Sequence, residues 1–189
     1  MKNNFLTNKD FSKLNFKKIG KNVFISVKAS IIGHENIEIG DNVRIDDFSI
    51  IVCKKGNIKI GNNVHIAAFC YLNGSNNLII GNYCNFSQGV KIYTKSDNYD
   101  GSTLTNPTFN EKYTKPIKGS VIISKHSIFG SGTVIMPNIK IEEGVAVGAL
   151  SLVKKNLKKW SIYAGVPVKF ISKRKKITKK MELSALNNI

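Results

Sequence analysis

Cysteine and histidine are scarce in this chain. Its 189 residues include three of each. Cys53, Cys70 and Cys84 lack the close spacing of metal ligands. Two of them fall where the repeat described below needs a small inward side chain. We therefore predict that the cysteines are reduced packing residues and that the chain binds no metal.

Long hydrophobic runs are also missing. No stretch approaches the roughly 20 consecutive apolar residues that a membrane-spanning helix needs. The first residues, from Met1 to Asp10, contain neither an apolar core segment nor a small-residue cleavage site. We therefore predict no transmembrane segment, no secretion signal and a cytoplasmic location.

Acidic residues are far fewer than basic ones. Twenty-nine Lys and Arg against twelve Asp and Glu give a formal net charge of +17. Such a chain has enough cations to bind many phosphates, but no nucleic-acid-binding motif accompanies them and the excess is heaviest after Lys154. We expect a solvated lysine-rich surface or a site for a small polyanion, and no nucleic-acid partner.

A six-residue period dominates the C-terminal half. Large apolar residues, here called anchors, recur at Ile123, Phe129, Ile135, Ile141, Val147 and Val153. A smaller inward position follows four residues later, at Ser127, Thr133, Ile139, Val145 and Ser151. Neither helical periodicity nor simple strand alternation produces this pattern. It is typical of a parallel β-helix, in which three short strands make one triangular turn.

The same period runs earlier, from Ile39 to Ile45, from Ile60 to Leu72 and from Ile80 to Ile92. Gly or a small residue often follows an anchor and Asn, Asp or Gly often comes next, which we interpret as sharp corners that tolerate positive φ. The alternative, an all-β sandwich of short strands, does not explain the constant phase. We predict an all-β solenoid over residues 23–160, preceded by an N-terminal cap segment at 1–22.

The period fails across residues 93–119. A stretch of this length without apolar periodicity is unusual in a compact domain and usually carries function or is disordered. Its three tyrosines, one phenylalanine and many turn residues favour an ordered arm. Because loops on a rigid scaffold hold binding and catalytic groups, we predict that residues 93–119 form the active-site loop.

The repeat ends near Lys154. Gly165 and Pro167 indicate a turn against the last coil, and good helix formers predict a short helix from Lys179 to Leu186. We expect residues 161–189, which contain this turn, the helix and a basic tail, to cap the open end of the solenoid.

These features resemble the hexapeptide-repeat acyltransferases, which are left-handed parallel β-helices, and within them the polysaccharide-associated sugar acetyltransferases that use acetyl-CoA. The resemblance covers roughly Val23 to Arg174. Its most specific pieces are Ile-Met-Pro-Asn-Ile-Lys-Ile-Glu-Glu-Gly from Ile135 and Tyr-Ala-Gly-Val-Pro-Val-Lys from Tyr163. By resemblance we expect a homotrimer that holds acyl donor and sugar in a groove between neighbouring coils.

The resemblance also implies where the acyl donor lies. Family members lay the pantetheine arm of CoA along the C-terminal coils, against small side chains, and meet its phosphates with basic ones. The positions carried over are Ser131, Gly148, Ala149, Lys154, Lys169, Lys173 and Arg174. Corner packing for the small residues and solvated charge for the basic residues are the alternatives.

The usual catalytic base of this family is absent. Many relatives place a histidine in the loop after the coil that ends here at Ile92, but counting in step with that pattern reaches Asp97. A carboxylate with an ordinary pKa of about 4 is a poor base for a sugar hydroxyl. Asp97 would need burial or a like-charged neighbour such as Asp100 to raise its pKa. A neutral sugar amine needs less help, because its nitrogen can attack the thioester itself.

Other residues are candidates for contact with the acceptor. Asn73 matches a substrate-contacting asparagine of some relatives, or is a turn residue. In the loop, Tyr93, Asn98 and Tyr99 are predicted to contact the sugar, with anchoring of the loop as the alternative for the tyrosines. His65 points outward from its coil, where it could face a neighbouring subunit's groove, and is the second catalytic candidate, with a surface or interface histidine as the alternative.

The two remaining histidines, His34 and His126, are predicted to face solvent. Zinc-dependent chemistry of the γ-class carbonic anhydrase kind, which uses histidines across a subunit boundary, is disfavoured because no two histidines form a close pair.

The leading hypothesis is an acetyl-CoA-dependent O-acetyltransferase that acts on a sugar of a cell-surface polysaccharide, such as lipopolysaccharide O-antigen or capsule, or on its precursor. N-acetyl transfer to a nucleotide-linked amino sugar is the alternative. A non-catalytic trimeric scaffold of the same fold is the competing class. Because the loop has no cysteine, we expect direct transfer in a ternary complex.

Overall fold

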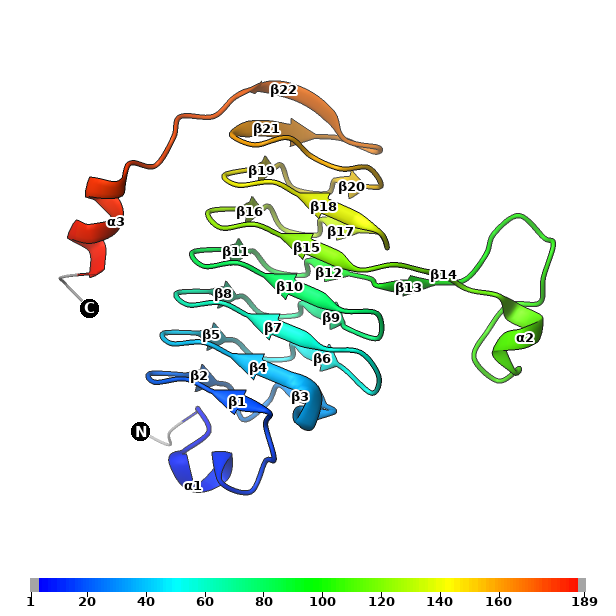
Figure 1. The fold of residues 1–189 in the computed structure, drawn as a ribbon, viewed down its shortest axis with the longest axis horizontal. Coiled ribbons are helices and arrows are strands. Elements are labelled where there is room, and N and C mark those ends of the chain that lie inside the picture. Colours follow the sequence, from blue (N-terminus) through cyan, green and yellow to red (C-terminus); the bar gives the residue numbers. More distant parts are fainter. Residues whose placement is uncertain (1–3, 187–189) are drawn as a thin grey trace.

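The chain winds into a three-sided coil (Figure 1). The structure is a computed structural model that describes residues 4–186. Three sheets, here called faces 1, 2 and 3, run the length of the stack, and successive coils add one short strand to each. The parallel β-helix predicted from the six-residue period is confirmed.

The strands of each face come from successive coils. Face 1 contains β1 (Lys18–Ile19), β4 (Ile37–Ile39), β7 (Ile58–Ile60), β10 (Leu78–Ile80), β15 (Val121–Ile123) and β18 (Ile139–Ile141). Face 2 contains β2 (Phe24–Ile25), β5 (Arg44–Ile45), β8 (His65–Ile66), β11 (Asn85–Phe86), β16 (Ile128–Phe129), β19 (Ala146–Val147), β21 (Ser161–Ala164) and β22 (Lys169–Lys173). Face 3 contains β3 (Ser30–Ile32), β6 (Ile50–Val52), β9 (Tyr71–Asn73), β12 (Lys91–Ile92), β17 (Val134–Ile135) and β20 (Leu152–Val153).

The core is a column of stacked anchors. All six predicted anchors between residues 123 and 153 are buried, as are the five smaller inward residues and the three cysteines. Phe86 and Phe129 stack on adjacent coils of face 2, with ring centroids 5.1 Å apart. The buried hydroxyl of Thr133 donates to the Gly130 carbonyl at 2.8 Å, so a small polar residue can occupy an inward position without losing its hydrogen bond.

The corners show why glycine follows an anchor. Positive φ occurs two residues after that glycine, at Asn42 (55°) and Asn63 (55°), and not at Gly61 itself. At Gly61 a Cβ would lie 2.4 Å from Asn82 Oδ1 of the next coil. The predicted corners with positive φ are confirmed at these asparagines, whereas the glycine is required by the close stacking of the coils.

The arm leaves the coil at the corner between faces 3 and 1. Its stem is an antiparallel pair, β13 (Lys95–Ser96) with β14 (Ile117–Lys118), and its outer part holds the helix α2 (Glu111–Thr114). Figure 1 shows the arm projecting sideways from the stack. The ordered arm predicted from the loop's composition is confirmed.

The coil extends beyond both expected ends. A short helix, α1 (Asn8–Phe11), comes first, but β1 lies inside the segment predicted to be a cap and pairs with β4 as part of the stack. At the other end β21 continues face 2 in parallel with β19, beyond the expected boundary at residue 160. A 3₁₀ helix, η1 (His34–Asn36), follows β3. None of the helices described within residues 4–186 has the length and hydropathy to cross a bilayer.

The predicted C-terminal helix is confirmed as α3 (Lys179–Leu186), but its expected position over the open end is wrong. In Figure 1 the helix lies beside the coils, and the last coil is bordered by β22, which pairs antiparallel with β21. Glu182 of α3 holds this position, because its carboxylate meets Lys125 at 3.2 Å and His126 at 2.6 Å.

The predictions that His126 and His34 face solvent are also wrong. The His126 side chain is only 4% exposed and its ring stacks on Tyr83 with centroids 4.9 Å apart, because α3 covers this corner. His34 is half-buried, with its ring edge-on to Phe16 at 4.7 Å, because the N-terminal segment folds against it.

We predict that Phe86→Ala lowers the free energy of unfolding by about 3–5 kcal/mol, because it removes one half of a buried ring stack and leaves a cavity. Urea denaturation of the purified protein measures this change. Ile79→Ala, on an exposed position of β10, is the control and should cost less than about 1 kcal/mol. Equal losses in the two variants would contradict a core built on inward anchors.

Candidate active site

A pocket of about 660 Å³ lies on face 3 at the root of the arm. We call it the arm pocket. It is lined by Tyr71, Asn73, Ser75, Tyr93, Lys95, Ser96, Asp97, Tyr99, Pro107, Val134 and Met136. Four of the residues predicted from sequence, Asn73, Tyr93, Asp97 and Tyr99, are therefore brought together. The other lining residues were missed. Tyr71, Val134 and Met136 are outward positions of the coils, which carry no periodic signal, and the remaining ones lie in the arm or at a corner, where the repeat is absent.

Aromatic side chains form one wall of the arm pocket. The rings of Tyr71 and Tyr93 come from adjacent coils and lie 5.4 Å apart. Burial raises the pKa of Tyr93, so its hydroxyl stays protonated at neutral pH and can donate a hydrogen bond. Tyr99 lies at the mouth and is 85% exposed. A flat apolar ring with a polar edge suits contact with a sugar.

Asn73 shapes this wall. Its Oδ1 accepts hydrogen bonds from the Ser75 amide at 2.9 Å and from Thr94 Oγ1 at 3.2 Å, and its Nδ2 donates to the Tyr71 hydroxyl at 3.3 Å. These contacts are those of a turn asparagine, which was the alternative to substrate contact. They also fix the position of Tyr71 in the pocket.

Asp97 is half-buried in the arm pocket. Within residues 4–186, no side chain or amide forms a hydrogen bond or ion pair with its carboxylate. The expected like-charged neighbour, Asp100, is bound instead to Ser102, whose amide donates to it at 2.8 Å and whose hydrogen bonds hold the pKa of Asp100 below its usual range. Asp97 is thus a carboxylate that is free to meet a ligand.

Asn98 is not among the residues that line the arm pocket. Its Oδ1 accepts from the Asp100 amide at 3.2 Å and its Nδ2 donates to Ser102 Oγ at 3.3 Å. Its amide therefore stabilises the loop that carries Asp97 and Tyr99.

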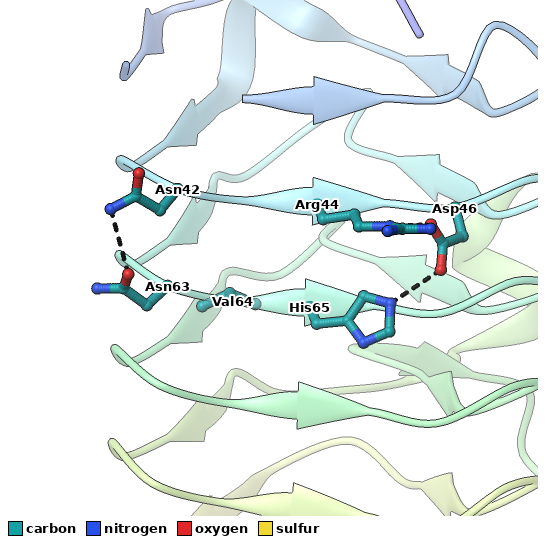
Figure 2. Close-up of a pocket in the computed structure, with 6 residues that line it drawn as sticks. All are labelled: Asn42, Arg44, Asp46, Asn63, Val64 and His65. Atoms are coloured by element: carbon teal, nitrogen blue, oxygen red, sulfur yellow. Dashed lines mark hydrogen bonds and ion pairs between the residues drawn. The ribbon is translucent and has the colours of Figure 1, made fainter. Parts of the chain in front are cut away.

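His65, the second catalytic candidate, lies on β8 of face 2, in a separate pocket of about 540 Å³ (Figure 2). Its Nε2 lies 2.8 Å from Asp46 Oδ2, and its Nδ1 lies 3.0 Å from Asn85 Oδ1. Arg44 Nε donates to the other Asp46 oxygen at 2.6 Å. Burial of Asp46 opposes its ionisation, but the hydrogen bonds from His65 and Arg44 hold its pKa below the usual range. Within one protomer, His65 is not brought to Asp97.

Four of the seven predicted CoA positions, Ser131, Gly148, Ala149 and Lys169, lie at the corner between faces 2 and 3. The Leu150 amide, next to Ala149, donates to the Ser131 carbonyl at 2.8 Å, and Gly148 directly precedes this corner. Lys169 lies opposite Ala164 at the end of the same corner. A Cβ on Gly148 would lie 3.0 Å from Ala164 Cβ, so close packing also accounts for this glycine.

The other predicted CoA positions lie elsewhere. Lys154 follows β20 at the corner between faces 3 and 1, and Lys173 pairs with Ser161 at the far end of β21. Arg174 Nη1 donates to the His126 carbonyl at 2.8 Å and the Gly144 carbonyl at 3.1 Å. This guanidinium joins the C-terminal segment to the corner between faces 1 and 2.

The cysteines are unsuited to nucleophilic catalysis. Burial raises the pKa of Cys70 to about 11 and that of Cys84 to about 12, so both thiols stay protonated at neutral pH. Among residues 4–186, no three His, Cys, Asp or Glu side chains gather in an arrangement that would hold a metal ion.

Comparison with known proteins identifies the family. No family model matches the chain. The chain is 39% identical to a dTDP-4-amino-4,6-dideoxy-D-glucose acyltransferase of Escherichia coli over 182 residues, which cover 96% of this chain and 94% of that protein. The chain belongs to the hexapeptide-repeat acyltransferases. The left-handed β-helix and the acyltransferase activity that the resemblance implied are thereby confirmed.

Two further acyltransferases are similar to this chain, one over nearly its full length and one at lower sequence identity. AntD, an N-acyltransferase from Bacillus cereus, was crystallised with dTDP-4-amino-4,6-dideoxyglucose and coenzyme A as a serine-to-alanine variant. It aligns with a TM-score of 0.94 and 40% identity over 99% of this chain and 100% of AntD. The putative lipopolysaccharide biosynthesis O-acetyl transferase WbbJ of Escherichia coli K12 is more distant, with 24% identity over 84% of this chain and 80% of WbbJ.

One ion-pair cluster attaches α2 to the stem of the arm. The Glu111 carboxylate accepts hydrogen bonds from Lys118 and Lys95, one on each strand of the stem. These bonds lower the pKa of Glu111 to about 2. The contribution of this contact to arm stability is therefore complete above the ordinary pKa of 4.5, and is lost only as the pH falls through about 2.

We predict that Glu111→Gln makes the arm open more often, because the two lysines lose their shared anion. Trypsin at neutral pH should then cut after Lys112 severalfold faster, as measured by mass spectrometry of timed digests. Glu35→Gln, an exposed carboxylate on η1, is the control and should not change the rate. Unchanged cleavage in Glu111→Gln would show that this contact does not hold the arm.

Proposed function

We propose that this protein transfers an acyl group from an acyl-CoA to the amine of a nucleotide-linked amino sugar. The observation that carries this proposal is the unpartnered Asp97 carboxylate in a tyrosine-lined pocket without histidine. Similarity over nearly the full chain supports it, both to the dTDP-4-amino-4,6-dideoxy-D-glucose acyltransferase of Escherichia coli and to the N-acyltransferase AntD. The comparisons thus favour the alternative derived from sequence over the O-acetylation placed first.

The chemistry of an amine suits a carboxylate as the proton acceptor. When the neutral amine attacks the thioester carbonyl, a C–N bond forms and the nitrogen becomes positively charged, which makes its N–H protons far more acidic. Asp97 can accept one of these protons, the C–S bond then breaks, and CoA leaves as the thiol once protonated. A sugar hydroxyl would have to lose its proton as it attacks, which requires a stronger base.

A spacing in the relatives supports the role of Asp97. The AntD structures include variants of a serine and of an aspartate that lie ten residues apart. In this chain Ser87 and Asp97 are the only serine and aspartate in this order at that spacing. Ser87 follows β11 at the corner between faces 2 and 3, and its amide donates to the Phe129 carbonyl at 3.0 Å. It therefore lies next to the corner that carries Ser131 and Gly148.

The expected homotrimer is part of this proposal. Ser87 and Asp97 lie at opposite corners of face 3 in one protomer, so a neighbouring protomer offers a way to bring the two groups to one acceptor. The corner of Ser87 also exposes apolar side chains: Phe48 and Phe69 stack 5.2 Å apart while 50% and 61% exposed, and Leu150 is 76% exposed. Exposed apolar side chains gathered along one edge favour contact with another subunit.

We predict that light scattering on the purified protein gives three times the mass of the chain. Phe69→Asp should shift the protein toward smaller species, because it places a charge in the proposed interface. A wild-type protein with the mass of one chain would contradict the trimer.

We predict turnover with dTDP-4-amino-4,6-dideoxyglucose and acetyl-CoA, measured by release of free CoA thiol. The matched acceptor dTDP-6-deoxyglucose, with a hydroxyl in place of the amine, should react at least about a hundredfold more slowly. Faster transfer to the hydroxyl sugar would favour O-acetylation, which the similarity to WbbJ supports. If CoA binds but neither acceptor is acylated, the result would favour a non-catalytic trimeric scaffold of the same fold.

We predict that Asp97→Asn lowers kcat at least about tenfold, because the amide cannot accept the proton. Asp100→Asn, three residues along the same loop, is the matched control and should keep kcat within about twofold. Equal kcat values for Asp97→Asn and wild type would remove Asp97 from the mechanism.

A further inference from the structure

A second pocket, of about 350 Å³, lies beside the arm pocket and gathers four lysines. We call it the lysine pocket. It is lined by Lys54, Lys55, Ser75, Asn76, Lys95, Glu111 and Lys118. Four cations face a single carboxylate here, so the pocket keeps a net positive charge. A cleft lined by charges of one sign concentrates ligands of the opposite sign.

Two of the four lysines are paired with a carboxylate and two are not. Lys95 and Lys118 share the Glu111 carboxylate, which shows that the stem of the arm can hold an oxyanion between two ammonium groups. Lys54 and Lys55 lie at the corner loop between β6 and β7 and are exposed. Within residues 4–186, no ion pair or hydrogen bond occupies either ammonium group. They are available to bind an anion.

The lysine pocket and the arm pocket share a wall. Ser75 and Lys95 line both, so one ligand can extend from the first into the second. An amino sugar linked through C1 to a diphosphate carries its C4 amine on the opposite side of the ring. If the amine meets Asp97 in the arm pocket, the diphosphate lies on the far side of the sugar, where lysine ammonium groups suit phosphate oxygens.

The phosphates of CoA have a different predicted place. Lys54 and Lys55 belong to an early coil, between β6 and β7, whereas the positions predicted for CoA lie on the last coils, from Ser131 onward. The lysine pocket is therefore left for the acceptor.

We infer that the lysine pocket binds the diphosphate of the nucleotide-linked acceptor, with Lys54 and Lys55 as its unengaged cations and Lys95 at the boundary with the sugar. This inference rests on the proposed function for the identity of the acceptor. It adds a binding role for residues that take no part in the acyl transfer itself.

The test is calorimetric titration of the full-length protein with dTDP, which carries the diphosphate but no amino sugar. The double variant Lys54→Gln/Lys55→Gln should raise the Kd for dTDP roughly tenfold, the effect of losing about one charge-assisted hydrogen bond. Lys59→Gln/Lys140→Gln, two exposed lysines on face 1, removes the same charge and should leave the Kd unchanged. In turnover assays the first variant should raise KM for the acceptor and leave kcat and KM for acyl-CoA unchanged.

The outcomes separate this inference from the proposed function. If dTDP binds wild type and both double variants equally, the lysine pocket does not hold the diphosphate, even when turnover is normal. If the Lys54/Lys55 variant loses dTDP affinity while no amino sugar is acylated, the binding site stands and the proposed reaction fails. An equal loss of affinity for thymidine, which has no phosphate, would overturn the assignment to the diphosphate.

Discussion

Each coil must return in register over the coil before it, and this constraint determines where chemistry can lie. Ile58 pairs with Leu78, twenty positions later, and Leu78 pairs with Val121, forty-three positions later, yet both pairs are parallel neighbours on face 1. The second link carries the whole arm. The anchors fill the inward positions, and the backbone groups of the strands pair with the neighbouring coils. An insertion can therefore leave the coil only at a corner. The arm does so between faces 3 and 1, and the pockets that it helps to form are the result.

The side chains at the root of the arm divide into two chemical regions. On one side, tyrosines and a carboxylate without a protein partner form a pocket suited to a sugar and its amine. On the other side, lysines carry more positive charge than the one carboxylate beside them balances. The ion pairs of Glu111 with Lys95 and Lys118 hold α2 against the stem of the arm, next to both regions. The rigid coil fixes the positions of the side chains at the root of the arm. A free loop of this length would have to become ordered on binding, which would cost conformational entropy.

Sequence reasoning succeeded where burial repeats with a fixed period. The six-residue spacing predicted the anchors, and helix propensity predicted α3, because both signals are local. It failed where distant segments meet: His126 is buried because its ring packs against Tyr83 and meets Glu182 of α3. In the site, loop position and resemblance predicted Asp97. Tyr71 was missed because it points outward from its coil and joins the pocket only when the coils stack.

In the complex that we propose, the amine of the acceptor meets Asp97 while its diphosphate lies among the lysines beside the arm. A crystal structure of this protein with dTDP-4-amino-4,6-dideoxyglucose and coenzyme A would test this arrangement. We expect the amine within hydrogen-bond distance of an Asp97 carboxylate oxygen and the diphosphate next to Lys54 or Lys55. A sugar bound instead in the pocket of His65 and Asp46, with the arm pocket empty, would contradict it.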